Sequence, residues 1–239
     1  MAEALRENHT LRSLELQRNL VGAAGAAALA ETLRSHAALT ALDVSDNTIG
    51  DEGAAAIGAA LRTNTTLTTL GLGDNGIGAA GAAALGKALL DAPLAVLQLS
   101  FNEVGDAGAV ALAKMLSTNV KLRHLGLRRN RVGVAGTVSL AAALASNATL
   151  TWLDLKSNRV RHAGAAALAD ALRTNGGLTT LELSCNEIGI DAAVALGAAV
   201  QSNRRLEALV LLKNRVGDGG DAALRPLRSI VQFQRIGRS

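Results

Sequence analysis

A short alternating pattern and a longer helical pattern follow one another along the chain. In one such unit, Leu42 and Val44 alternate with less apolar neighbours, which is the period of a strand with one buried face. After Asn47 the spacing lengthens, and Ile57 and Leu61 stand four residues apart in an alanine-rich run, as on one face of a helix. The pattern therefore predicts a short strand, a loop and then a helix in each unit.

The unit recurs with an almost constant length. The pattern L-x-x-L-x-(L/V)-x-x-N begins eight times, at intervals of 28 residues except for one interval of 27. A short helix with one narrow apolar stripe is not stable alone, so each unit must bury its stripe against its own strand and its neighbours. We therefore expect an α/β solenoid of eight repeats of about 28 residues. The repeats begin at Leu11, Leu39, Leu67, Leu94, Leu122, Leu150, Leu178 and Leu206.

The last position of the pattern is an asparagine in all eight repeats. An asparagine side chain can bond backbone groups that a turning chain would otherwise leave unpaired. We therefore expect a structural role at each of these positions. They are Asn19, Asn47, Asn75, Asn102, Asn130, Asn158, Asn186 and Asn214.

Two glycines follow each asparagine, with Arg161 and Ala192 as the two departures. Glycine suits a tight turn, so both glycine positions are predicted to lie in the loop that leads into the helix. Three aspartates, Asp51, Asp106 and Asp218, come directly after the first glycine. We expect each to cap the helix that follows it, where its charge faces the positive end of the helix dipole.

In full, the repeat reads L-x-x-L-x-L-x-x-N-x-(I/V)-G-x-x-G-A-x-x-L. In this form the chain resembles leucine-rich repeats of the ribonuclease-inhibitor-like subfamily, which also occur in NOD-like receptors and Ran GTPase-activating proteins. The resemblance implies a right-handed solenoid shaped as a partial horseshoe, with parallel strands on the concave face, helices on the convex face and a protein partner on the concave face. Two alternatives stay open: a GTPase-activating protein of the Ran type, although the acidic C-terminal tail common in that family is missing, and a regulatory repeat region of a NOD-like sensor.

We expect a single domain over residues 1–239. Residues 1–10 align with the end of a repeat, residues 11–225 hold the eight repeats, and residues 226–239 form a C-terminal cap or tail. Pro226 is predicted to end the last helix. Because the sequence starts partway through a repeat, we expect an apolar edge at the N-terminal end, which could support end-to-end self-association.

Composition narrows the class of protein. Hydrophobic residues make up 49% of the chain with only two Phe, one Trp and no Tyr, so small aliphatic side chains must form the core. No apolar run approaches the ~18 residues of a membrane span, and the first residues do not form a secretion signal. A single cysteine, Cys185, cannot form an internal disulfide. We expect a cytoplasmic protein, and a net charge of +4 is too small to indicate nucleic-acid binding.

The residues between the buried leucines of a strand must face the concave side, because side chains alternate along a strand. The first three repeats carry Glu15, Asp43, Asp46 and Asp74 there, whereas the fifth and sixth repeats are basic. Aromatic and arginine side chains are frequent binding hot spots, and the sole tryptophan falls in this basic region. We predict that a protein partner with an acidic surface contacts Phe101, His124, Arg128, Arg129, Trp152, Asp154, Lys156 and Arg159.

Other interpretations stay open for this surface. Charged residues occur on any solvated face, and Trp152 could instead pack over Gly126 to fill the space left by a missing side chain. Catalysis has less support. Asp154 and Glu182, one strand apart, could serve acid–base chemistry or hold a metal ion, but an open sheet has no pocket that excludes water. We therefore predict no catalytic, metal or cofactor site.

Overall fold

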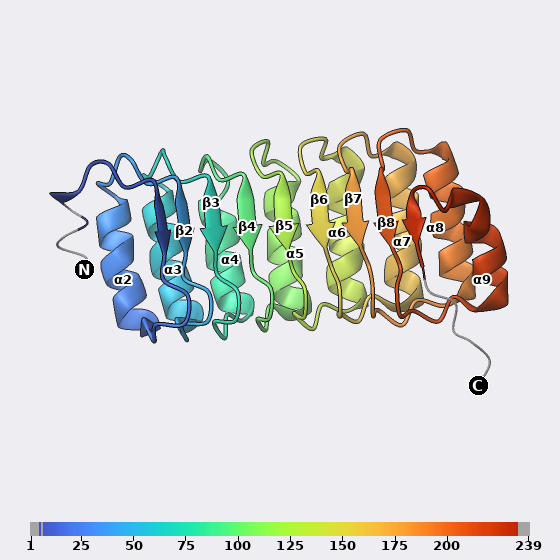
Figure 1. Ribbon diagram of the computed structural model, residues 1–239, viewed down its shortest axis with the longest axis horizontal. Coiled ribbons are helices and arrows are strands. Elements are labelled where there is room, and N and C mark those ends of the chain that lie inside the picture. Colours follow the sequence, from blue (N-terminus) through green and yellow to red (C-terminus); the bar gives the residue numbers. More distant parts are fainter. Residues whose placement is uncertain (1–4, 6, 234–239) are drawn as a thin grey trace.

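The computed structural model describes residue 5 and residues 7–233, which form one curved stack of strand–helix units (Figure 1). The described residues contain nine short strands, which make one parallel sheet in which each strand pairs with the next one in the chain. The strands are β1 (Ser13–Glu15), β2 (Ala41–Asp43), β3 (Thr69–Gly71), β4 (Val96–Gln98), β5 (His124–Gly126), β6 (Trp152–Asp154), β7 (Thr180–Glu182), β8 (Ala208–Val210) and β9 (Val231–Gln232).

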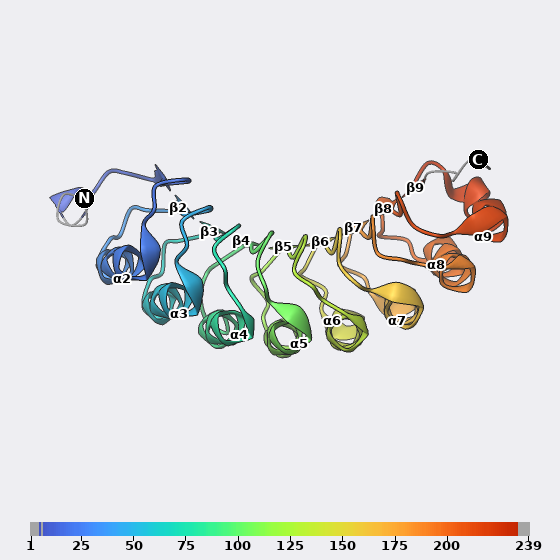
Figure 2. The same cartoon turned by 90° about the horizontal axis from the view of Figure 1, so that it is seen from below.

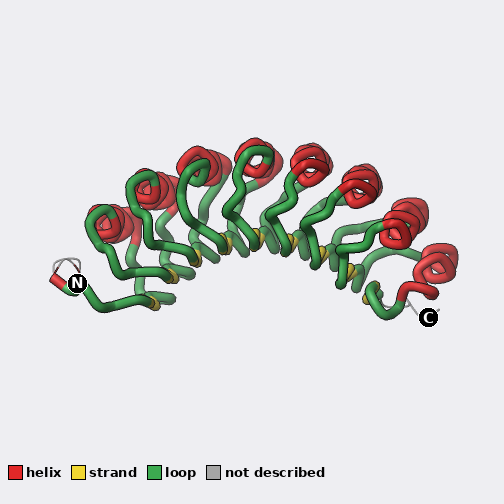
Figure 3. The backbone as a smooth tube through the Cα atoms, turned by 90° about the horizontal axis from the view of Figure 1, so that it is seen from above, coloured by secondary structure: helices red, strands yellow, loops and turns green. Residues whose placement is uncertain are grey.

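Helices connect the strands and all lie on one side of the sheet. Strands line the inner side of an arc and helices its outer side (Figures 2 and 3). This arrangement confirms the predicted solenoid, with parallel strands on the concave face and helices on the convex face. The helices are α2 (Gly22–Leu33), α3 (Gly50–Leu61), α4 (Ala79–Ala88), α5 (Gly105–Leu116), α6 (Val134–Ser146), α7 (Arg161–Thr174), α8 (Ile190–Ser202), α9 (Gly217–Leu224) and the short 3-10 helix η1 (Arg225–Leu227).

The hydrophobic core lies between the sheet and the helices and continues from repeat to repeat. In the second repeat, Leu42 and Val44 from the strand segment and Ile57 and Leu61 from α3 are at most 1% exposed. Leu42 stands in register with Leu70 of the next strand, so equivalent leucines stack along the solenoid. Burial of this stripe between neighbours stabilises helices that are too short to form alone.

The helices begin earlier than the sequence predicts. Helix α3 already starts at Gly50, so the second glycine, Gly53, lies in its first turn rather than in the loop. A Cβ atom on Gly53 would lie 2.7 Å from Cβ of Ile49 and 2.9 Å from Cβ of Ala26 on α2. The second glycine therefore serves close packing between neighbouring helices, and not the turn.

The prediction that the aspartates cap their own helices is wrong for Asp51 and Asp106. Asp51 lies in the first turn of α3, and its Oδ1 accepts hydrogen bonds from the backbone N–H groups of Gly78 and Gly81 at 2.7 and 2.9 Å. These two groups belong to the start of α4, in the next repeat. Asp106 makes the same two bonds to the start of α6, at 2.6 and 2.9 Å. Each aspartate thus caps a neighbouring helix and ties two repeats together.

The C-terminal end of the described chain departs from the repeat. Helix α9 ends at Leu224, and Pro226 follows within η1, as expected for a residue that cannot continue a helix. Strand β9 then pairs with β8, and Phe233 packs against the core with Cζ of Arg228 5.8 Å from its ring centroid. The remaining residues of the two terminal segments, 1–4, 6 and 234–239, lie outside the described part.

The eight asparagines that end the repeat pattern form a hydrogen-bonded row along the loops between strands and helices, here called the first ladder. At Asn158, Oδ1 accepts hydrogen bonds from the N–H groups of Asn130 and Val132 at 3.0 and 2.9 Å. Its Nδ2 donates to the carbonyls of Leu127 and Leu155 at 2.8 and 2.9 Å. The side chains of the seven asparagines from the second repeat onward all bond the preceding repeat, and so satisfy buried backbone groups there.

A second row of hydrogen bonds, not predicted from the sequence, runs along the opposite edge, where helices lead into strands; we call it the second ladder. At Asn64, Oδ1 accepts from the N–H of Leu67 at 2.8 Å, and Nδ2 donates to the carbonyl of Leu33 at 2.7 Å. The corresponding residue of the fourth repeat is Ala92, whose side chain cannot make these bonds. The other members are Asn8, His36, Asn119, Asn147, Asn175 and Asn203.

Among the described residues, no helix has the length and apolar character needed to cross a lipid bilayer.

Candidate protein-binding surface

The concave face displays columns of side chains that run across the strands. Two columns lie on the strands in strict register, with His124 beside Trp152 and Gly126 beside Asp154. A third column consists of the residues two positions after the end of each strand, and it includes Arg128 and Lys156. Next to it, a fourth column has a left-handed backbone throughout, with φ between 51 and 62°. Its residues are Arg18, Asp46, Asp74, Phe101, Arg129, Ser157, Cys185 and Lys213.

Phe101, Arg128 and Arg129 form a cluster in the middle of the concave face. The Cζ atoms of Arg128 and Arg129 lie 5.1 and 5.3 Å from the ring centroid of Phe101. Cation–π attraction at these distances holds both guanidinium groups beside the ring. Within the described part of the chain neither arginine forms an ion pair, and Nε of Arg128 is buried with no hydrogen-bond partner. The cluster therefore presents two cations that are not held in ion pairs, with the buried carboxyl of Asp154 near Arg128.

The position of Phe101 is unusual for its side chain. Its ring is 40% exposed, and its φ of 62° is one that bulky residues rarely adopt. Packing in the core therefore does not account for an aromatic side chain here. All eight residues of the fourth column share this left-handed backbone, so the conformation belongs to the repeat, and it is the exposed aromatic side chain that distinguishes Phe101.

His124 and Trp152 form a second cluster on the same face. Their ring centroids are 5.8 Å apart with the planes inclined by 47°. Arg128 comes four positions after His124 in the same repeat, so this ring pair lies roughly 13 Å from the arginine cluster. The space over Gly126 is filled by Gln98, whose amide atoms are the nearest to the glycine. Trp152 is thus not the side chain that fills the gap at Gly126.

Asp154 lies in the floor between the two clusters. It is 8% exposed, and its Oδ1 accepts a hydrogen bond from the N–H of Lys156 at 2.7 Å. Burial raises the pKa of this carboxyl above its usual value, and the charge of Glu182 raises it further. The bond from Lys156 and the nearby Arg128 and Lys156 cations oppose the rise in pKa. Because this carboxyl is buried and bonds the backbone, it stabilises the local chain conformation and exposes little surface to a partner.

Two further predicted residues lie at the margin of the surface. Lys156 is half-buried in the third column beside Arg128. Arg159 is exposed but follows Asn158 in the loop between β6 and α7, where its N–H bonds the carbonyl of Val132 at 2.8 Å. It therefore belongs to the rim above the strands, and not to the strand surface itself.

The acidic half of the concave face is hollow. A depression of about 580 Å³ extends from the third and fourth columns of the first repeat to Phe101. It is open because Gly73 has no side chain and its neighbours Ser45 and Ser100 are small. One of its carboxylates, Asp46, pairs with Nε of Arg18 at 3.2 Å. Phe101 thus marks the boundary between an acidic hollow and a basic patch.

Sequence reasoning missed several features that depend on contacts between repeats. It did not identify the stacking of two guanidinium groups on Phe101, because nothing in the one-dimensional pattern fixes where long side chains end. It also missed the acidic hollow, although Gly73 in an exposed column was a signal. Among the described residues, no three His, Cys, Asp or Glu side chains come together as a metal site would require.

A model of the leucine-rich repeat family matches six segments of the chain, which together cover more than half of it. The matched segments are residues 7–30, 37–58, 63–86, 93–113, 146–169 and 178–197. The chain belongs to the leucine-rich repeat family. The structure agrees, because the matched segments follow the strand and helix units described above.

Solved leucine-rich repeat structures share the fold at low sequence identity. A structure of actin-binding site 2 of leiomodin-1 is 22% identical, with a TM-score of 0.53 over 61% of this chain and 86% of that one. The tropomodulin C-terminal domain of Caenorhabditis elegans is 16% identical, with a TM-score of 0.52 over 61% of this chain and 90% of that one. No protein of curated function matches the sequence significantly. At these identities the likeness establishes the fold alone.

Proposed function

We propose that this leucine-rich repeat domain is a non-enzymatic protein-binding module whose concave face takes an acidic segment of a partner protein. The observation that carries the proposal is the arginine pair stacked on exposed Phe101, with no ion pair among the described residues. Guanidinium groups bind carboxylates through paired hydrogen bonds, and stacking on a ring holds them ready for this geometry.

The charge arrangement also supports one orientation of the proposed partner. An acidic segment fits over Arg128 and Arg129, while a basic side chain fits the hollow that contains Asp46 and Asp74. Opposed charges of this kind raise the association rate and fix the direction of binding. The ring pair of His124 and Trp152 offers a second, apolar contact on the same face.

The experiment compares binding by matched charge reversals on different parts of the solenoid. Wild type, Arg128→Glu/Arg129→Glu and Arg204→Glu/Arg205→Glu are each immobilised, and proteins captured from a lysate of the source cells are identified by mass spectrometry. Arg204 and Arg205 are exposed in the loop between α8 and β8, so the control changes the net charge equally away from the concave face. We expect the first variant to lose a partner that the control retains.

Quantitative binding then tests the second cluster. For the captured partner, we expect Trp152→Ala to weaken binding by about tenfold or more, as for a buried aromatic hot spot. A partner bound equally by wild type and by correctly folded Arg128→Glu/Arg129→Glu would contradict the proposal. Actin is one named protein to include, because the leiomodin-1 structure is described as an actin-binding site.

The non-enzymatic part of the proposal has a separate test. A GTPase-activating role of the Ran type predicts faster GTP hydrolysis by a Ran-like GTPase when the protein is added in excess. We expect an unchanged rate of hydrolysis, because the concave face is an open sheet without a cavity that excludes water. An accelerated rate would replace the binding-module proposal by an enzymatic one.

A further inference from the structure

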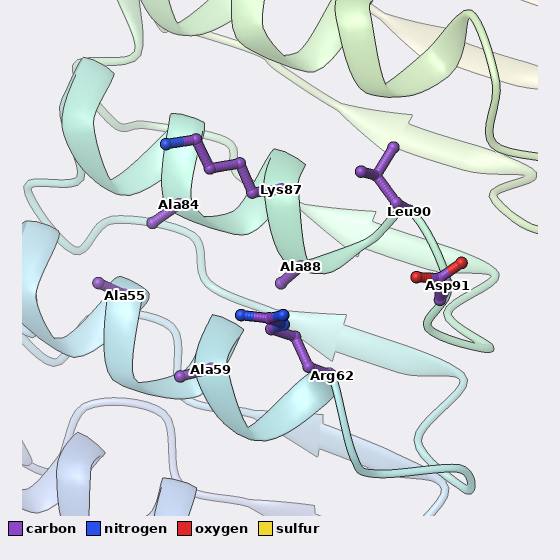
Figure 4. Close-up of a pocket in the computed structure, with 8 residues that line it drawn as sticks. All are labelled: Ala55, Ala59, Arg62, Ala84, Lys87, Ala88, Leu90 and Asp91. Carbon is purple, nitrogen blue, oxygen red and sulfur yellow. The ribbon is translucent and has the colours of Figure 1, made fainter.

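The convex face changes character over α4. This helix has 10 residues, whereas its neighbours α3 and α5 have 12 each. It also belongs to the one 27-residue interval, in which the second ladder is interrupted at Ala92. Two hollows flank it, one toward α3 of about 550 Å³ and one toward α5 of about 400 Å³. Figure 4 shows the first, with Ala55 and Ala59 on α3 opposite Ala84 and Ala88 on α4.

The hollow between α4 and α5 is formed by matching faces of two helices. On α4 and the turn that follows it, the lining residues Ala83, Gly86, Lys87 and Leu90 have the i, i+3, i+4, i+7 spacing of one helix face. The lining residues of α5 follow the same spacing. A Cβ atom on Gly86 would lie only 3.2 Å from the backbone oxygen of Ala111, so the two helices approach closely beneath the hollow. The floor is therefore a shallow apolar groove along about two helical turns.

Leu90 supplies an exposed apolar side chain at the end of this groove. It is 48% exposed. The residues in its register in the other repeats are polar or small, and include Arg62 in the preceding repeat and Ser117 in the next one. Leu90 therefore extends the apolar floor of the groove at one end, where the neighbouring repeats have polar side chains.

Both charged residues that line the groove, Lys87 and Lys114, are basic. The adjoining hollow toward α3 adds one cation, Arg62, and one carboxylate, Asp91. Within the part of the chain that the structure describes, none of these four residues forms an ion pair. Elsewhere on the convex face, Arg34 directly after α2 and Arg173 on α7 each have a carboxylate three residues earlier, at 3.7 Å.

We propose that the groove between α4 and α5 is a docking site for an acidic amphipathic helix of a partner protein. Leucine-type side chains of the bound helix contact Leu90 and the alanine floor, and carboxylates on its flanks pair with Lys87 and Lys114. A helix that binds in a groove contacts it through its side chains at positions i, i+3, i+4 and i+7. The lining residues of both helices that form this groove have the same spacing. The site lies on the face opposite the proposed concave surface and is independent of it.

A designed peptide of about four helical turns is the probe. It carries leucines at i, i+3, i+4 and i+7 with glutamates on both flanks, and a second peptide has lysines in place of the glutamates. Binding of the labelled peptides is followed by fluorescence anisotropy. We expect wild type to bind the glutamate peptide at least about tenfold more tightly than the lysine peptide, with the preference falling as salt is raised.

Three variants assign the binding to the groove. Leu90→Arg introduces the residue found in the same register at position 62, and we expect an affinity loss of about tenfold or more from the lost apolar contact. Lys87→Glu/Lys114→Glu is expected to abolish the preference for the glutamate peptide. Arg173→Glu, a charge reversal on α7, is the control and should bind as wild type does. All these positions are exposed, and circular dichroism verifies that each variant folds.

The outcomes separate this site from the concave one. The concave face is itself proposed to take acidic segments, so the groove variants are also made in the Arg128→Glu/Arg129→Glu background. Peptide binding that remains in this background and is lost with Leu90→Arg belongs to the groove, so failure of one proposal leaves the other intact. Absence of binding by wild type, equal binding of the two peptides, or equal binding by Leu90→Arg and wild type would overturn the docking site. A second copy of this chain is another possible occupant of the groove, and sedimentation velocity tests it. A wild-type dimer that Leu90→Arg converts to a monomer would assign the groove to self-association and would also overturn the proposal.

Discussion

The two ladders hold opposite edges of the same solenoid, but only one of them is complete. The first ladder has an asparagine in every repeat, and the second replaces it by His36 in one repeat and by Ala92 in another. Where the second ladder is interrupted at Ala92, helix α4 is shorter and Leu90 is exposed. The comparison teaches that the edge of the first ladder keeps one side chain in all eight repeats, whereas the opposite edge varies, and that the surface beside the varied position differs too.

The largest expected effect comes from breaking the first ladder in its interior. Asn158→Ala leaves the N–H groups of Asn130 and Val132 and the carbonyl of Leu127 without their partner. Buried groups of this kind cost about 1–3 kcal/mol each, so we expect a loss of more than about 3 kcal/mol in the free energy of unfolding. Urea denaturation followed by the fluorescence of Trp152, the single tryptophan, measures it.

Asn19→Ala is the matched control for this prediction. Asn19 is exposed, and its Nδ2 donates to the carbonyl of Gln17 in its own repeat at 2.8 Å. We expect a change of less than about 0.5 kcal/mol, as for an ordinary surface substitution. Similar losses for the two variants would mean that the bonds between repeats are not what stabilises the loop edge.

The next largest effect comes from the backbone of the loop edge. Gly105 has φ of +59°, and a Cβ atom added there would have nothing within 4 Å, so Gly105→Arg tests the conformation alone. We expect a loss of about 1–2 kcal/mol, the cost of a left-handed backbone for a residue with a Cβ atom. Arg161 occupies the equivalent position with φ of 55°. Denaturation midpoints of the single variants and the double variant provide the measurement.

Arg161→Gly should act in the opposite direction. Relief of its left-handed backbone is expected to stabilise the fold by about 1 kcal/mol. Part of this gain is offset by loss of the ion pair between Arg161 and Glu187, whose exposed side chains lie 3.4 Å apart and contribute at most about 1 kcal/mol. Destabilisation by Arg161→Gly would contradict the assignment of strain to this position.

The period of the sequence was enough to predict the fold. Leucines every 28 residues require a stacked solenoid, and alternation within each strand placed His124 and Trp152 side by side on the concave face, where the structure has them. The starts of the helices and the partners of Asp51 were predicted wrongly. Those depend on contacts between repeats, and a pattern read within one repeat does not contain them.

The candidate surface was predicted less completely than the fold. Arg128, Arg129 and Phe101 were chosen as residue types, but their stacking depends on side-chain conformations that the sequence pattern leaves undetermined. Asp154 was chosen as an exposed carboxylate, and the structure buries it. The second ladder was present in the sequence as the recurring Asn-x-x-Leu, yet its role emerges only when the helix ends of neighbouring repeats lie together.

A smaller effect should follow from completing the second ladder at His36. This residue is 5% exposed; its Nδ1 accepts from the N–H of Leu39 at 3.1 Å, and its Nε2 has no hydrogen-bond partner among the described residues. His36→Asn keeps an acceptor and supplies a donor placed for the carbonyls of Leu5 and Asn8, by analogy with Asn64. We expect stabilisation of up to about 1 kcal/mol, the net value of one hydrogen bond. An unchanged or lower thermal midpoint would show that the imidazole fits this site better than an amide.

The smallest expected effect comes from Asp154. It compares a charged side chain with the neutral asparagines of the ladders, since both bond the backbone. Asp154 bonds the backbone much as a ladder asparagine does, but with a buried carboxylate whose pKa is raised mainly by burial. A carboxyl with a raised folded-state pKa destabilises the fold as pH rises through that pKa, because the folded state then binds more protons than the unfolded state. Asp154→Asn should therefore raise the urea midpoint near neutral pH by less than Arg161→Gly does. The difference from wild type should shrink as pH falls toward 3.8, the ordinary pKa of the group, and a difference independent of pH would show that the charge of Asp154 is not its cause.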